Sequence, residues 1–321
     1  MDHDRGVEVN EILAQILTIG TLTVILAKTT PILLAAIGGG LSQVGNILNI
    51  GLEGLLLVGA FTGIAVGAVT DPFTGVVAAL AAGVLLSLIY AIASLVFKAD
   101  YIVVGIGTNL LAVGITVLLL TVLYGNAGVT PGDVKSVLPK IDLGPVGDIP
   151  VIGPLFNSHT ILVWIALVLV PVYWFVLYRT RFGVHLRAVG EDEAAARAAG
   201  IRVFQVKFIS ILVTGALCGL AGAQLSMASV GSFTSGMTSG RGFIVVAAVI
   251  FAAGRPLPTL LVCLVFGAAD GLADRLALGG VNSSLALLTP YIITIIALIA
   301  AALRVRSAVK ARAKRGLVQL T

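Results

Sequence analysis

Long apolar runs separated by short polar segments make up most of the chain. One run, ILVWIALVLVPVYWFVLY at 161–178, lacks the apolar–polar alternation that a strand of a membrane β-barrel would show. Runs of this kind approach the roughly 20 apolar residues that a helix needs to cross a bilayer. The pattern predicts an all-α, polytopic transmembrane helical bundle with about ten spans, within a range of roughly eight to ten. We expect the spans at 11–27, 30–44, 46–68, 74–97, 101–124, 159–178, 206–229, 234–253, 257–275 and 285–303.

Composition supports the same fold class. Hydrophobic residues make up 58% of the 321 residues and charged residues 11%, whereas a soluble domain averages about 25% charged residues. The chain is therefore expected to form one transmembrane domain over 1–321. Cys218 and Cys263 both lie in apolar runs, which favours buried thiols over a disulfide framework. The acidic start, MDHDRGVEVNE, does not resemble a cleaved signal peptide.

The distribution of basic residues predicts the orientation. If the N-terminus is cytoplasmic, most of the 20 Lys and Arg residues fall on the cytoplasmic side, in agreement with the positive-inside rule. The C-terminus is then cytoplasmic too. The tail at 304–321 begins RVRSAVKARAKRG and is expected to anchor the topology near anionic lipid, because so short a tail has no nucleic-acid-reading module.

Polar residues enter the apolar run SQVGNILNIGLEGLLLVGAF at 42–61. Ser42, Asn46, Asn49 and Glu53 are spaced so that they would lie on one face of a continuous helix. Such a face should point into the bundle or an aqueous cavity, because lipid would leave it unsatisfied. Interhelical hydrogen bonding is the alternative use of the two asparagines. The three glycines at 38–40 are expected to break a helix just before this stripe or to allow close helix packing; we favour the break.

A second polar stretch, SVGSFTSGMTSGRGFIVVAAVIFA at 229–252, places Arg241 ahead of another apolar run. Its SGRG and the earlier GLEG occupy comparable places, which predicts two related halves with broken helices around a midplane site. Glu53 and Arg241 are expected to pair, directly or through other groups. Otherwise Glu53 would cap the N-terminus of a broken helix. Asn109 is a further candidate for the same cavity.

Two segments are expected outside the membrane. The Gly- and Pro-rich segment 125–158 is predicted to be an ordered external loop that contacts another protein or simply connects two spans. On the cytoplasmic side, EDEAAARAAG at 191–200 predicts a short helix with acids in its first turn and Gly200 at its end. That helix could dock on a partner or serve as a connector.

Sequence motifs for chemistry are missing. The chain has no G-x-x-x-x-G-K-[ST] phosphate-binding loop and no Ser, His and acid set on facing spans. Its three histidines fit no metal-ligand spacing. The sequence therefore predicts no catalytic residues, no metal site and no bound cofactor, and any work driven by ATP would come from another chain.

Several stretches resemble the inner-membrane permeases of bacterial ABC importers. They belong to the branch for nucleosides and simple sugars, related to the branched-chain amino acid and ribose permeases. The matching stretches are NIGLEGLLLVGAF at 49–61, VVGIGTNLLAVGIT at 103–116, LRAVGEDEAAARAAGI at 186–201 and GRPLPTLLVCLVFGAADGL at 254–272. The resemblance implies that 186–202 is a segment that couples to the ATPase, with Gly190, Glu191, Ala195, Ala199 and Gly200 as its residues.

The resemblance also implies an assembly in the bacterial cytoplasmic (inner) membrane. Two permease subunits, identical or related, would pair with two ATP-binding subunits, which hold ATP and Mg. An external solute-binding protein, commonly a lipoprotein, would deliver the solute. The implied function is the transmembrane subunit of such an importer, for a small polar solute and first of all a purine nucleoside. A simple sugar or a branched-chain amino acid is the alternative solute, and a proton-coupled secondary transporter is the alternative class.

Overall fold

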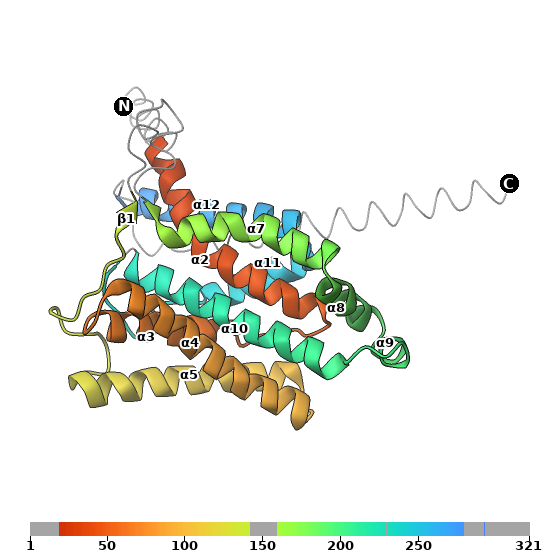
Figure 1. Cartoon of the computed structure of the whole chain (residues 1–321). Coiled ribbons are helices and arrows are strands. Elements are labelled where there is room, and N and C mark those ends of the chain that lie inside the picture. Colours follow the sequence, from red (N-terminus) through yellow and green to blue (C-terminus); the bar gives the residue numbers. More distant parts are fainter. Residues whose placement is uncertain (1–18, 142–158, 229, 279–291, 293–321) are drawn as a thin grey trace.

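The computed structural model describes residues 19–141, 159–228, 230–278 and 292, and these residues form an almost entirely helical bundle (Figure 1). Two short strands, β1 (Lys140–Ile141) and β2 (His159–Thr160), pair antiparallel. The helices are α2 Ile19–Val44, α3 Leu52–Gly67, α4 Pro72–Ala91, a π-helical turn Ile92–Val96, α5 Tyr101–Tyr124, α7 Ile161–Arg179, α8 Arg181–Glu191, α9 Glu193–Ala198, α10 Val203–Met227, α11 Arg241–Ala252 and α12 Pro256–Leu278.

The predicted all-α membrane bundle is confirmed in its coarse form. Within the described ranges, six helices are long and apolar enough to cross a membrane: Gly20–Val44, Pro72–Val96, Tyr101–Tyr124, Ile161–Arg179, Val203–Met227 and Pro256–Arg275. Two further apolar helices, α3 and α11, have 16 and 12 residues and are shorter. The expected span at 285–303 lies outside the described residues.

The first two expected spans are wrong, because 19–44 is one continuous helix. The predicted turn between them falls at Lys28 and Thr29, inside α2 and directly before Thr30. The hydroxyls of Thr29 and Thr30 donate to the carbonyls of Ile25 and Leu26, one turn earlier in the helix. These polar residues are thus satisfied within the helix and do not end it. The predicted cytoplasmic N-terminus falls on residues 1–18, outside the described part of the chain.

The helix break expected at the three glycines is also wrong, and the alternative use of these residues is confirmed. Gly38, Gly39 and Gly40 lie within α2. A Cβ on Gly38 would lie 3.0 Å from the Cα of Thr214, and one on Gly40 would lie 2.6 Å from the hydroxyl of Tyr173. The glycines therefore let α7 and α10 approach α2 closely. The chain leaves the helix after Val44 instead, in the connection 45–51.

Helix α10 lies in the centre of the bundle and packs against α2, α3 and α4. Its buried glycines bring backbone against backbone: a Cβ on Gly222 would lie 2.2 Å from the carbonyl oxygen of Leu56, and one on Gly219 would lie 2.3 Å from that of Ala79. Small residues at such spacing are typical of helix interfaces in membranes. The packing leaves no room for relative sliding of these four helices without repacking.

The two ends of the bundle carry different elements: short helices lie at one end, and the two short strands lie at the other (Figure 1). Helices α8 and α9 and the turn between α4 and α5 lie at one end. Lys98 belongs to that turn and Arg197 to α9, so the positive-inside rule predicts that this end faces the cytoplasm, and we call it the cytoplasmic end below. The opposite end carries β1 and β2. There the described part of the segment predicted to be external, 125–141, is bonded to residues at and after the end of α10: Ser136 N–H donates to the Gly231 carbonyl, and Leu138 N–H to that of Met227. Residues 142–158 lie outside the described part.

This orientation predicts a labelling pattern. A cysteine at Asp133, which is exposed on the external segment, should react in intact cells with a thiol reagent that cannot cross the membrane. A cysteine at Ala194, exposed on α9, should react only after the membrane is opened. The background should be low because Cys218 and Cys263 are completely buried. The reverse labelling pattern would overturn the orientation.

Candidate functional site

Glu53 binds the N-terminus of α11. Its two carboxylate oxygens accept hydrogen bonds from Gly240 N–H, at 2.9 Å, and from Gly242 N–H, at 2.6 Å. Gly240 is the N-cap residue of α11, has φ +78° and has no side chain with which to cap the helix. A carboxylate at this position satisfies two free N–H groups and interacts favourably with the positive end of the helix dipole. The alternative predicted for Glu53, capping of a broken helix, is therefore confirmed.

The direct pairing of Glu53 with Arg241 is wrong. The Arg241 guanidinium instead donates to the carboxylate of Asp270 on α12, with distances between 3.0 and 3.3 Å. Because backbone N–H groups satisfy Glu53, Arg241 is left to compensate a different buried acid. The two side chains are only 19% and 14% exposed. The start of α11 therefore connects two other helices. Gly240 and Gly242 bond to Glu53 on α3, and Arg241 between them bonds to Asp270 on α12.

Lys28 extends this charged cluster to α2. Its ammonium lies 2.6 Å from the Asp274 carboxylate and 4.0 Å from that of Asp270. Lys28, Arg241, Asp270 and Asp274 therefore form a connected set of two cations and two anions, which we call the charged cluster. Intramembrane ionisable residues that are paired in this way are typical of pathways for solutes or ions.

The predicted polar stripe does not form one helix face, because the chain is not helical between Val44 and Leu52. Ser42 lies in α2, where its hydroxyl contacts that of Thr214 at 2.8 Å. Asn46 is exposed and has φ +58° in the turn that follows α2. Asn49 is buried, and its side-chain oxygen accepts from Gly51 N–H. Asn49 thus satisfies the backbone where the helix is interrupted, and Ser42 bonds to a neighbouring helix, so polar residues at helical spacing occur here without forming a polar face.

Asn109, on α5, binds the backbone at the same interruption between α2 and α3. Its amide nitrogen donates to the Ile50 carbonyl at 3.0 Å, and its oxygen accepts from Gly54 N–H at 2.8 Å. The side chain thus bridges the end of the connection and the first turn of α3. In this structure Asn109 contacts backbone groups, and neither it nor Glu53 is among the lining residues of the two cavities described next.

Two polar cavities adjoin the charged cluster towards the external end of the bundle. One, of about 160 Å³, is lined by Lys28, Arg241, Asp270 and Gln224 together with apolar residues. The other, of about 360 Å³, is bounded by Lys28, Asp274, Gln224, His159 and Thr160. Both share Lys28 and Gln224, and the Gln224 amide oxygen accepts a hydrogen bond from the Thr160 hydroxyl at 2.8 Å. Of the predicted cavity residues, only Arg241 lines one of these two spaces.

The sequence prediction missed Lys28, Gln224, Asp270 and Asp274. Lys28 was expected in an external turn. Asp270 and Asp274 carried a usable signal, since two acids four residues apart in a membrane span lie on one helix face and need cationic partners. Gln224 stands alone in an apolar run and had no comparable signal.

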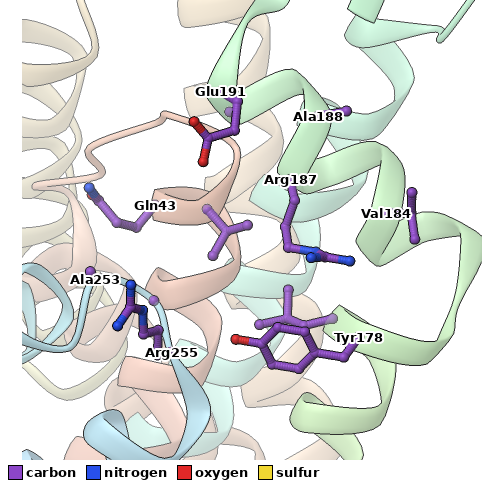
Figure 2. Close-up of a pocket in the computed structure, with 12 residues that line it drawn as sticks. Gln43, Tyr178, Val184, Arg187, Ala188, Glu191, Ala253 and Arg255 are labelled. Atoms are coloured by element: carbon purple, nitrogen blue, oxygen red, sulfur yellow. The ribbon is translucent and has the colours of Figure 1, made fainter.

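A third cavity, of about 570 Å³, opens at the cytoplasmic end beside α8 (Figure 2). Gln43 and Val44 border it from the end of α2, and Ala253, Gly254 and Arg255 border it from the turn between α11 and α12. Gly190 and Glu191, two of the predicted coupling residues, form its α8 wall together with Arg187. The Arg187 guanidinium lies 5.2 Å from the ring centre of Tyr178.

The predicted coupling helix is present but shorter than expected. Glu191 ends α8, and α9 covers only Glu193–Ala198. Asp192 caps α9 by accepting from the N–H groups of Ala194 and Ala195, and Gly200, with φ +81°, follows its end as predicted. Ala195 and Ala199 are exposed, while Ala196 is buried against the bundle.

One acid of α9 is held by a membrane helix. The Glu193 carboxylate accepts from the Lys207 ammonium of α10 at 2.8 Å and also contacts Arg197. The hydrogen bond from Lys207, together with the charges of Lys207 and Arg197, lowers the pKa of Glu193 below its ordinary value. Glu193 therefore stays ionised at neutral pH.

Comparison with known proteins decides the family. The family model described as "Branched-chain amino acid transport system / permease component" matches residues 21–302. This chain belongs to that permease family. The permease is 36% identical over 288 residues to the guanosine ABC transporter permease protein NupQ of Bacillus subtilis, covering 85% of this chain and 89% of that protein. It is 34% identical over 299 residues to the nucleoside ABC transporter permease protein NupC of Lactococcus lactis, covering 87% and 92%. It is also 35% identical over 261 residues to the putative glucose ABC transporter permease protein TsgC13 of Haloferax volcanii, covering 80% and 77%.

Membership decides between the two transporter classes left open by the sequence. The chain is the permease of an ABC importer and not a proton-coupled secondary transporter. It is a multi-pass membrane protein and a non-catalytic subunit. In the part of the permease that the structure describes, no group of three or more His, Cys, Asp and Glu residues is placed to hold a metal ion.

Proposed function

We propose that the permease imports a purine nucleoside. The observation that carries this proposal is the 36% and 34% identity to a guanosine and a nucleoside permease over most of both chains. The cavities beside the charged cluster are compatible with it. They offer an amide at Gln224, a hydroxyl at Thr160 and charged groups at Lys28 and Asp274, which can hydrogen-bond ribose hydroxyls and the edge of a base.

The same proposal includes the assembly in the bacterial cytoplasmic membrane. Two ATP-binding subunits bind ATP and Mg, and the exposed face of α9 with Ala195 and Ala199 docks on one of them. A second permease, identical or related, completes the pathway. An external solute-binding lipoprotein delivers the nucleoside, and the segment 125–141 at the external end is the surface that it meets. The basic tail at 304–321 lies against anionic lipid.

We further propose how the membrane segments are arranged. The run at 285–303 crosses the membrane again, which returns the chain to the cytoplasm after α12 and makes the C-terminus cytoplasmic. The short helices α3 and α11 each follow a non-helical connection, 45–51 before α3 and 230–240 before α11, and these two connections mark corresponding places in two related halves. Glu53 joins the two connections, because it lies in the first turn of α3 and caps α11.

A simple sugar is the second candidate solute, because the putative glucose permease of Haloferax volcanii is 35% identical to this chain. A ribose import permease of Escherichia coli, 27% identical over 296 residues, adds to the same possibility. The pentose of a nucleoside presents the same hydroxyls as a free sugar. Discrimination between the two solutes therefore rests on recognition of the base.

Transport by the whole complex tests the proposal. The permease, its partner permease, the ATPase and the solute-binding protein are reconstituted in vesicles, and ATP-dependent uptake of labelled guanosine is measured. We expect uptake that excess unlabelled adenosine or guanosine suppresses and that excess ribose or leucine leaves unchanged. Uptake of labelled ribose or glucose in place of guanosine would establish the sugar alternative. A ligand screen on the solute-binding protein should give the same order of preference.

A further inference from the structure

Lys207 is a lysine held inside the protein where four helices meet. Its side chain is only 7% exposed, although it lies in the second turn of α10 at the cytoplasmic end. Its ammonium lies 2.8 Å from the Glu193 carboxylate, 3.4 Å from the Tyr101 hydroxyl and 5.8 Å from the centre of the Tyr101 ring. A cation in this position needs a charged partner, because desolvation of an unpaired ammonium is costly.

That partner, Glu193, lies on α9, a short helix that makes few other contacts with the bundle. Helix α9 has six residues, and Ala196 is its buried residue. Its remaining side chains, including Ala195 and Arg197, are exposed. Glu193, in the first turn, reaches back from this surface helix to the membrane helix α10. The Glu193–Lys207 ion pair, together with the burial of Ala196, therefore sets the position of α9 relative to the bundle.

Tyr101 extends the same junction to two further helices. It is the first residue of α5, directly after the capping residue Asp100, and its carbonyl accepts from the Tyr90 hydroxyl of α4 at 3.2 Å. Tyr90 is completely buried. Lys207 thus contacts α9 through charge, α5 through the Tyr101 ring and hydroxyl, and α4 indirectly through Tyr90.

Lys207 lies on α10, the central helix against which α2, α3 and α4 pack. Further along α10, Thr214 donates to the Gly38 carbonyl of α2 at 2.7 Å, and Ser226 donates to the Ala60 carbonyl of α3 at 2.9 Å. The glycines described above bring the backbones of α3 and α4 against α10. A shift of the cytoplasmic end of α10 must therefore move α2, α3 and α4 with it or break this packing.

We propose that the Glu193–Lys207 pair is the link that passes a displacement of α9 to α10 and from there to the membrane helices. Lys207 is then a positioning residue for coupling, which touches neither solute nor ATP. The inference rests on the proposed function in one respect, namely that α9 is the surface on which the ATPase docks. Its consequence is that loss of the pair separates ATP hydrolysis from transport without removing the docking surface.

The experiment compares Lys207→Gln, Glu193→Gln and the conservative Lys207→Arg in the reconstituted complex. The measured quantity is guanosine moved per ATP hydrolysed, which does not depend on how much complex is recovered. We expect this ratio to fall about fivefold or more in the two glutamine variants, as for loss of a coupling between sites. The double variant should fall no further than either single variant, and Lys207→Arg should retain most of the ratio. Lys98→Gln, which removes an exposed lysine at the same end, is the matched control and should leave the ratio unchanged.

Hydrogen exchange of the backbone amides of 193–199 gives a readout that needs no solute. In the purified complex, we expect faster exchange in Lys207→Gln than in wild type, Lys207→Arg or Lys98→Gln. A wild-type complex that moves no nucleoside would overturn the proposed solute, and exchange in α9 would still decide the role of the pair. The inference is overturned if Lys207→Gln lowers only the melting temperature while exchange and the transport ratio stay at wild-type values.

Discussion

Replacing Ala195 and Ala199 together with arginine is expected to abolish ATP-dependent transport and the stimulation of the ATPase by loaded solute-binding protein. Both alanines are exposed on or directly after α9, so the permease itself has room for the larger side chains. Arginine also has a high helix propensity, and α9 should still form. If α9 docks on the ATPase as proposed, the loss would come from a docking groove that accepts methyl groups and excludes two bulky cations.

The measurement is uptake together with ATPase rate in reconstituted vesicles, and equal membrane insertion is checked by the amount of permease recovered. Ala99→Arg provides the matched control, because Ala99 is an exposed alanine at the same end of the bundle but outside the coupling segment. Wild-type uptake by the double arginine variant would show that the ATPase docks elsewhere.

Breaking the Arg241–Asp270 pair should be among the most destabilising single changes in the membrane region. Arg241→Gln leaves Asp270 buried with Lys28 at 4.0 Å as its remaining cation, and Asp270→Asn leaves the arginine uncompensated. Each should cost about 3 kcal/mol of unfolding free energy, at the lower end for buried pairs because both side chains keep some exposure. The double variant should cost less than the sum of the two, because the residues are in direct contact.

A double-mutant cycle on the thermal unfolding of the purified permease measures this coupling. A second cycle with Arg241→Gln and Asp274→Asn is the control. Asp274 lies one turn further along α12, is 48% exposed and pairs with Lys28 instead of Arg241. Equal coupling energies in the two cycles would mean that the cluster acts through its net charge and that the Arg241–Asp270 contact has no special weight.

Helix positions could be predicted from the sequence wherever an apolar run is long and uninterrupted. The span expected at 101–124 coincides with α5. Those at 74–97 and 257–275 agree to within about three residues with α4 plus its π-helical turn, and with α12. The prediction failed at Lys28 and Thr29, which stand beside Thr30 in an apolar run and were interpreted as a turn between two spans. A local pattern could not show that the threonines bond to their own helix or that Asp274, far away in sequence, supplies the counter-charge.

The sequence predicted what kind of partners the candidate site residues need, but it did not predict which residues supply them. The chemistry of Glu53 required donors or a cation, and the structure supplies backbone donors at Gly240 and Gly242. Periodicity placed Asn49 and Glu53 on one helix face. The same spacing of polar residues also occurs where a helix is interrupted and polar side chains bond to the free backbone groups, so the pattern does not distinguish the two cases. The pairing of Arg241 with Asp270 depends on how α11 and α12 pack, which no spacing within either segment reveals.

The shortness of α11 has a consequence for how the protein is made. Its 12 residues span about 18 Å at 1.5 Å per residue, well under the roughly 30 Å of a bilayer's hydrocarbon core. The segment is too short to be recognised by the insertion machinery as a membrane segment of its own, and its N-terminal peptide groups have no partners in lipid. Glu53, which satisfies them, has been synthesised long before. During biosynthesis α11 should therefore enter the membrane only after α3 is folded in place, and Glu53→Ala should trap newly made chains with α11 accessible to added protease.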